Sequence, residues 1–170
     1  MRMVKVAVLA AAMVTAAASA ASAHDSDGGG WVPTSTPPFL NPAGSICPFE
    51  VKGDILRDEE RMRTLATFPD GSPSVQDFDG PLVIRFTNTA NGRSAVRDAT
   101  GRVRAYYLPD GTKIWQIHGG AAIPVRQGNT GFSPGDYLVH GDFVLVIHAD
   151  HTKELPVRLG RTEDICQTLA

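Results

Sequence analysis

Three tight-turn sequences divide this chain into strand-length pieces. Pro69-Asp70-Gly71 and Pro109-Asp110-Gly111 each lie between two strand-like runs, and Asn91-Gly92 separates a third pair. Such sequences supply the positive φ that a tight hairpin turn requires. Because strands joined by short turns pair antiparallel, this spacing predicts an antiparallel meander and an all-β fold.

The runs beside and beyond these turns have the period of half-buried strands. Residues 49–56, 82–87 and 155–159 each place a mainly apolar set on one face. Residues 143–148 are apolar on both faces, which is typical of a strand covered on both sides. About eight such strands suit an up-and-down barrel or a two-sheet sandwich, and the simple hairpin order favours the barrel.

Two segments allow more than one structure. Residues 54–68 have apolar spacings that also suit a helix, but we predict a hairpin that turns at Arg57-Asp58-Glu59, since the segment leads straight into a Pro-Asp-Gly turn. Asp77-Phe78-Asp79-Gly80 begins like a calcium loop. It lacks the further ligands and the closing Glu, so we interpret it as a turn before the strand at Leu82.

The beginning of the chain has the pattern of a secretory signal peptide. Arg2 and Lys5 precede an Ala-rich apolar run that ends in Ala21-Ser22-Ala23. This predicts a signal peptide over residues 1–23, an extracellular location, and His24 as the first mature residue. The apolar run is short for a membrane anchor, so no membrane association is expected after cleavage.

Export changes the interpretation of the two cysteines, Cys47 and Cys166. In an oxidising compartment an isolated pair predicts a disulfide, and neither cysteine has the C-x-x-C spacing of a metal site. Closing a loop of about 120 residues destabilises the unfolded chain by about 5 kcal/mol.

The composition and the cysteines together predict how the mature chain is divided. Residues 24–45 are rich in Gly and Pro, which predicts a flexible tether, and residues 46–170 are predicted to form a disulfide-closed β domain.

No motif in the sequence supports an assigned catalytic residue. Gly131-Phe132-Ser133-Pro134-Gly135 matches G-x-S-x-G, but Pro134 lacks the backbone N–H that would form half of the oxyanion hole. We therefore predict a turn that leads into the strand at Tyr137. With 16 Lys and Arg against 18 Asp and Glu, the chain is nearly neutral, which gives no electrostatic case for nucleic acid as a partner.

Histidines are the candidate metal ligands, for zinc or copper. His140, His148 and His151 lie near one another in the chain, without a compact metal-binding spacing. His24 is a separate case. As a first mature residue it resembles the histidine brace of the copper-dependent polysaccharide monooxygenases, a resemblance that implies copper bound by its amine and imidazole. We assign no cofactor.

Four aromatic residues form the predicted ligand surface, because exposed aromatic rings on a rigid sheet hold sugars or apolar ligands. The function expected is a non-catalytic extracellular β module for a small apolar or carbohydrate ligand. The alternatives are a copper-dependent oxidative enzyme and an isomerase or hydrolase at a barrel mouth. The four residues are Tyr106, Tyr107, Trp115 and Tyr137.

The layout as a whole resembles a group of small secreted actinobacterial β-rich proteins with a terminal disulfide. The signal peptide and the Pro/Gly tether are followed by Ile46-Cys47-Pro48-Phe49, by the turn Leu108-Pro109-Asp110-Gly111-Thr112, and near the end by Asp164-Ile165-Cys166. The resemblance implies export and the disulfide, and it implies no activity.

Overall fold

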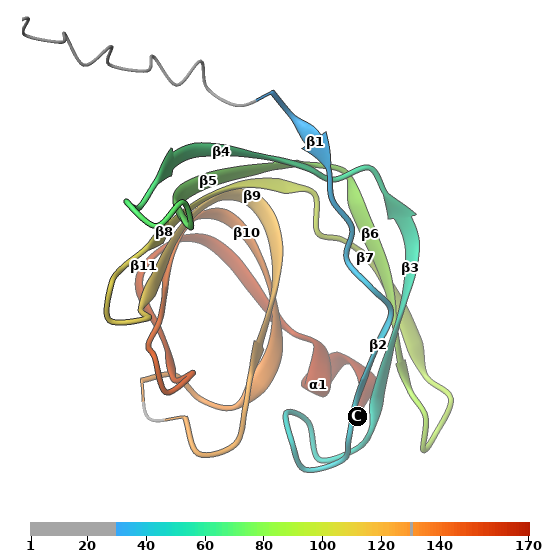
Figure 1. The fold of residues 1–170 in the computed structure, drawn as a ribbon. Helices are drawn as coiled ribbons and strands as arrows, with labels where there is room; N and C mark the ends of the chain where they lie inside the picture. Colours follow the sequence, from blue (N-terminus) through green and yellow to red (C-terminus); the bar gives the residue numbers. More distant parts are fainter. Residues whose placement is uncertain (1–29, 130) are drawn as a thin grey trace, which may run out of the picture.

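The described chain forms eleven strands and one short helix (Figure 1). The computed structural model describes residues 30–129 and 131–170, so the predicted signal peptide and His24 lie outside the described residues. Within these ranges no helix has the length and apolar character needed to cross a membrane. The elements are β1 (Val32–Pro33), β2 (Phe39–Asn41), β3 (Val51–Asp58), β4 (Arg61–Thr67), β5 (Pro73–Gly80), β6 (Leu82–Asn88), β7 (Ser94–Asp98), β8 (Gly101–Tyr107), β9 (Lys113–Val125), β10 (Gly135–Ile147), β11 (Lys153–Asp164) and α1 (Ile165–Leu169).

The strands form two antiparallel sheets, which confirms the predicted all-β class. The large sheet has seven strands in the order β1-β4-β5-β8-β9-β10-β11, and the small sheet has four in the order β2-β3-β6-β7. Four times the described chain passes from one sheet to the other without a hairpin, between β1 and β2, β3 and β4, β5 and β6, and β7 and β8. Figure 1 shows the large sheet strongly curled, with the small sheet beside it.

The preference for a closed barrel is wrong, and the chain adopts the two-sheet alternative. Over the described residues, β1 and β11 remain the edges of the large sheet. The strands bend from one sheet into the other at tight corners. Gly80, at one of them, has a φ of 141°, and a Cβ atom there would collide with the carbonyl oxygen of Glu59. Only glycine allows this close approach of two backbones.

The same corners explain two errors of local interpretation. Residues 54–68 form strands, as predicted, but not a hairpin, because β3 pairs with β2 and β6 whereas β4 pairs with β1 and β5. Asp77 and Asp79 lie within β5 rather than in a turn. In both segments the chain passes from one sheet into the other, whereas the sequence pattern predicts a tight turn.

The predicted tight turns are present. Gly71, Gly92 and Gly111 have φ values of 84°, 75° and 86°. The side chains of Asp70 and Asp110 each accept a hydrogen bond of 2.9 Å from the backbone N–H two residues later. These contacts stabilise the turn conformation locally, which is why the turns can be recognised without knowledge of the fold.

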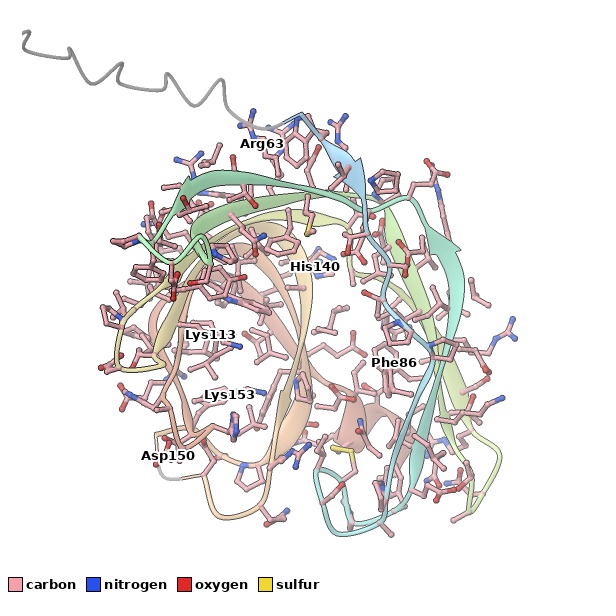
Figure 2. All side chains as sticks on the ribbon, in the orientation of Figure 1. Arg63, Phe86, Lys113, His140, Asp150 and Lys153 are labelled. Carbon is pink, nitrogen blue, oxygen red and sulfur yellow. A yellow bond between two sulfur atoms is a disulfide. The ribbon has the colours of Figure 1, made fainter. Side chains whose placement is uncertain are left out.

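The core consists of two clusters that meet along β10. One surrounds Phe86, which is labelled in Figure 2 and lies between the small sheet and α1. The other surrounds Phe143, inside the large sheet. Neighbouring residues at the start of β10 serve both, since Leu138 belongs to the first cluster and Val139 to the second. The double coverage predicted for residues 143–148 is therefore found nearer the start of this strand, and Val144 is only partly buried.

The predicted disulfide joins Cys47 to Cys166, with a Cα–Cα distance of 5.4 Å. Cys166 lies on α1, which packs against β10 and β11 of the large sheet and β6 and β7 of the small one. The bond thus connects the start of the small sheet to the end of the chain. It confirms the predicted pairing of the two cysteines.

The strands at the edges depart from their sequence patterns. The N-terminal segment, predicted as a flexible tether, adds β1 to the large sheet and β2 to the small one from residue 32 onward. A Pro-rich segment can pair in this way at an edge, where a missing N–H leaves no ladder partner unsatisfied. At the opposite edge, β11 buries Leu155, but Val157 and Leu159 of its predicted apolar face are exposed.

Candidate ligand-binding cavity

A cavity of about 540 Å³ lies between the two sheets. This volume is within the range of small-molecule sites in proteins. Its wall comes from the N-terminal segment, from β5, β8, β9 and β10 of the large sheet, and from β6 of the small sheet. The lining residues are Thr34, Ser35, Thr36, Pro37, Phe39, Asn41, Glu60, Phe78, Asp79, Leu82, Ile84, Ala99, Gly101, Val103, Trp115, Gly120, Ala121, Ala122, Pro124 and Asp136.

Most of this wall is apolar. Leu82, Ile84 and Val103 supply aliphatic surface, and three aromatic residues add ring surface. Within the described part of the chain, no lysine, arginine or histidine lines the cavity. The charged residues of the wall are Glu60, Asp79 and Asp136.

Asp136 is the most isolated of these carboxyl groups. Its residue is 2% exposed, and its Oδ2 atom has no hydrogen-bond partner among the described residues. It lies near the start of β10, on the same face as Leu138 and beside the disulfide, where its backbone N–H donates to Cys166 Sγ at 3.3 Å. Buried polar groups in folded proteins are almost always hydrogen-bonded, so this one requires an explanation.

The surroundings of Asp136 favour its protonated form. Burial raises the pKa of Asp136 to about 6, and the charge of Asp164 acts in the same direction, while Lys153 opposes both. Lys153 does not pair with Asp136, because its Nζ atom donates to the carbonyl oxygen of Pro124. A carboxyl group with a pKa near 6 is mainly ionised at neutral pH, and Lys153 offsets the negative charge of Asp136 only in part.

Trp115 supplies a second unsatisfied group on the same wall. It lies on β9, between Ala105 of β8 and Leu145 of β10. Its indole Nε1–H, a hydrogen-bond donor, is buried and has no acceptor among the described residues. Two residues of the cavity wall thus carry a buried polar atom without a partner, a donor on Trp115 and an acceptor on Asp136.

The N-terminal segment is held across the cavity by carboxyl groups at the corner between β3 and β4. Thr36 donates from its backbone N–H to Asp58 Oδ2 at 2.7 Å and from its hydroxyl to Glu60 Oε2 at 2.6 Å. Burial raises the pKa of the half-buried Glu60, and the neighbouring Asp58 adds to this effect. Phe39 completes the cover by packing against Phe86, with ring centroids 6.0 Å apart.

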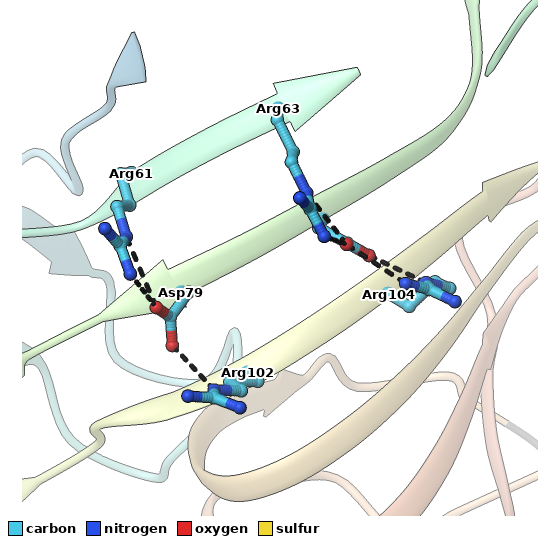
Figure 3. Close-up of polar contacts among 6 residues, drawn as sticks. Arg61, Arg63, Asp79, Arg102 and Arg104 are labelled. Carbon is cyan, nitrogen blue, oxygen red and sulfur yellow. Dashed lines mark hydrogen bonds and ion pairs between the residues drawn. The ribbon is translucent and has the colours of Figure 1, made fainter. Parts of the chain in front are cut away.

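Asp79 differs from Asp136 because arginines neutralise it. It belongs to a ladder on the outer face of the large sheet, in which Arg61 and Arg102 share Asp79 and Arg63 and Arg104 share Asp77 (Figure 3). The contacts range from 2.7 to 3.0 Å. Hydrogen bonds from Arg61 are the main cause of a lowered pKa for Asp79. Its charge is therefore already compensated.

Of the four aromatic residues predicted as a ligand surface, Trp115 lines the cavity and the three tyrosines do not. Tyr107 is partly buried and donates its hydroxyl to Gln76 Oε1 at 2.8 Å. Tyr106 lies near the outer ladder, close to Gln116. Tyr137 packs against Phe132, with ring centroids 4.6 Å apart. The structure therefore does not bring the four residues together.

The histidines predicted as metal ligands are also apart. His148 lies 3.3 Å from Glu154, His151 occupies a turn with a φ of 68°, and His140 lies on β10. His24 is outside the described residues. Among the residues that the structure describes, no group of three or more metal-binding side chains occurs.

The G-x-S-x-G motif has the local structure predicted for it. Ser133 is exposed in the connection between β9 and β10, and β10 begins at Gly135. A strand thus follows this serine, whereas a nucleophile elbow requires a helix there.

Sequence reasoning missed Asp136, the residue that distinguishes the cavity. The available signal is weak: an aspartate precedes the apolar run of β10, at the parity of Leu138. Such a residue at the beginning of a strand is normally solvated. Its burial depends on α1, which follows β10 and β11 in the chain, and on the disulfide that links α1 to Cys47.

Together these features define a class of protein: an antiparallel two-sheet β protein with one disulfide and a mainly apolar cavity between its sheets. No protein-family model matches the chain, and no curated protein or solved structure matches it either.

Proposed function

We propose that this protein is exported and binds a small, largely apolar molecule in the cavity between its sheets, without catalysing a reaction. The observation that carries the proposal is the cavity itself, about 540 Å³ with a mainly apolar wall. The wall favours an apolar ligand over a carbohydrate, because most sugar hydroxyls would lose their hydrogen bonds to water without gaining others.

Filling the cavity tests this proposal. Ala122 lies on the wall, so Ala122→Phe should abolish binding of an uncharged apolar dye such as N-phenylnaphthylamine, measured by the increase of its fluorescence. Ala90→Phe is the matched control, since Ala90 is exposed in a turn and the variant should bind like the wild type. Equal binding by both variants, each with an unchanged thermal midpoint, would refute the cavity as the site.

Export rests on the predicted signal peptide and on the disulfide, because such bonds persist in oxidising compartments. The resemblance to small secreted actinobacterial proteins belongs to the same proposal. We expect protein in the culture medium whose mass begins at His24. Cytosolic protein that retains residues 1–23 and has reduced cysteines would contradict it.

One observation favours a second function, an isomerase or hydrolase acting within the cavity. A carboxyl group with a pKa near 6 has the proton affinity suited to general acid–base catalysis, and Asp136 is such a group. Turnover of a bound ligand, followed by NMR and lost in Asp136→Asn, would establish this function in place of simple binding. Unchanged ligand after prolonged incubation supports the binding protein.

A further inference from the structure

We propose that the cavity selects an organic cation: an amine with an apolar body, whose ammonium group pairs with the Asp136 carboxylate. This inference rests on the proposed function and specifies its ligand. An unpaired carboxylate 2% exposed is unfavourable in the empty protein, and a cationic group that donates hydrogen bonds to it relieves that state.

The charges around the cavity all point to a cation. Asp136 and Glu60 are its carboxyl groups outside the arginine ladder, and none of the lining residues described is basic. A carboxylate ligand would add like charge to a mainly apolar space, which is unfavourable. A neutral alcohol could donate a hydrogen bond to Asp136 but would leave its charge uncompensated.

The protein offers Asp136 no substitute for such a ligand. The charged groups that face it are Asp164 and Lys153, both on β11, and α1 contributes Cys166 but no charged side chain. Asp164 Oδ1 accepts the backbone N–H of Cys166 at the start of α1, and Lys153 is directed to the Pro124 carbonyl oxygen. Neither donates a hydrogen bond to Asp136 Oδ2, although Lys153 lies close enough to lower the pKa of Asp136 in part.

The rest of the wall suits the body of an amine. Aliphatic side chains cover the apolar part of a ligand, and the rings of Phe39, Phe78 and Trp115 also line the space. Aromatic faces attract cations in addition to packing against apolar groups. An apolar amine would thus find a partner for each of its two parts.

Titration calorimetry of the purified protein tests the inference with three ligands of equal chain length: decylamine, decanol and decanoate. We expect decylamine to bind at least about tenfold more tightly than decanol, the factor typical of a hydrogen bond to a charged group, and decanoate to bind most weakly. Asp136→Asn should remove the preference for decylamine and leave decanol binding unchanged. Asp54→Asn, the matched carboxyl control outside the cavity wall, should keep the preference.

A second measurement needs no variant. Lowering the pH of the wild-type protein from about 8 to about 4.5 protonates Asp136 and should remove the same preference. Equal affinity for decanol and decylamine at the higher pH, or a preference that survives Asp136→Asn, would overturn the inference and leave the proposed function intact. If none of the three ligands binds, both the proposed function and the inference of a cationic ligand are refuted.

Discussion

Asp77 and Asp136 are both buried aspartates on strands of the same sheet, but their surroundings are opposite. Asp77 is 8% exposed and lies between Arg63 and Arg104, and hydrogen bonds from Arg104 are the main cause of its lowered pKa. Asp136 is 2% exposed, has no such partner, and has a raised pKa. Burial alone thus does not determine the state of a carboxyl group. Pairing makes Asp77 part of the scaffold, and the lack of it makes Asp136 a candidate binding group.

Removing the disulfide should have the largest effect on this comparison. The double variant Cys47→Ser/Cys166→Ser should lose about 5 kcal/mol of unfolding free energy in urea titrations. Because α1 would then cover Asp136 less tightly, the pKa of Asp136 should fall toward its ordinary value in an NMR titration. Asp77 lies on the outer face and should keep its lowered pKa. A parallel change at both residues would show that the disulfide does not act locally.

Asp136→Asn should stabilise the protein at neutral pH by about 2 to 3 kcal/mol, because it removes an ionised group whose folded pKa is raised by about two units. Protonated Asp136 contributes stability below about pH 4, and this contribution is lost as the pH rises through about 6. The gain of the variant should therefore disappear at low pH. Urea midpoints at several pH values measure it, and a loss of stability at pH 7 would mean that the carboxylate has a partner in solution.

Asp77→Asn should destabilise the protein by about 1 to 2 kcal/mol at neutral pH, because Arg63 and Arg104 lose a shared charged acceptor but remain partly hydrated. The sign of the pH dependence is reversed, since a lowered pKa stabilises the fold above about pH 4 and the contribution is lost below it. Asp54→Asn is the control: its pair with Lys52 is more exposed and should be worth less than about 0.5 kcal/mol. An equal effect at both sites would remove the distinction between ladder and surface pair.

Local features of the fold could be predicted because their causes are local. The turn at Pro109-Asp110-Gly111 depends on two local features. Its glycine has a positive φ, and its aspartate side chain accepts a hydrogen bond from the backbone N–H two residues later. The antiparallel class follows from such turns, and the disulfide follows from two cysteines in a chain expected to be exported. None of these inferences requires knowledge of which strands lie opposite one another.

The candidate site could be predicted only in part. Trp115 was recognisable as an aromatic residue on a strand, and it lines the cavity. Tyr106 and Tyr107 share that description but do not line the cavity: Tyr106 lies close to Gln116, and the hydroxyl of Tyr107 donates to Gln76. Asp136 has no local signal of isolation. Whether Asp136 has a hydrogen-bond partner depends on the positions of the arginines, Lys153 and α1 in the folded protein.

The sequence by itself determined the all-β class, the three tight turns and the pairing of Cys47 with Cys166, since each follows from the chemistry of a few neighbouring residues or from the predicted compartment. Tertiary structure alone decided that the meander divides into two sheets rather than closing, that a cavity remains between them, and that Asp136 is unpaired while Asp77 is paired. The reason is physical: a carboxyl group's state depends on the charges and water that surround it in space, and residues distant in sequence supply both.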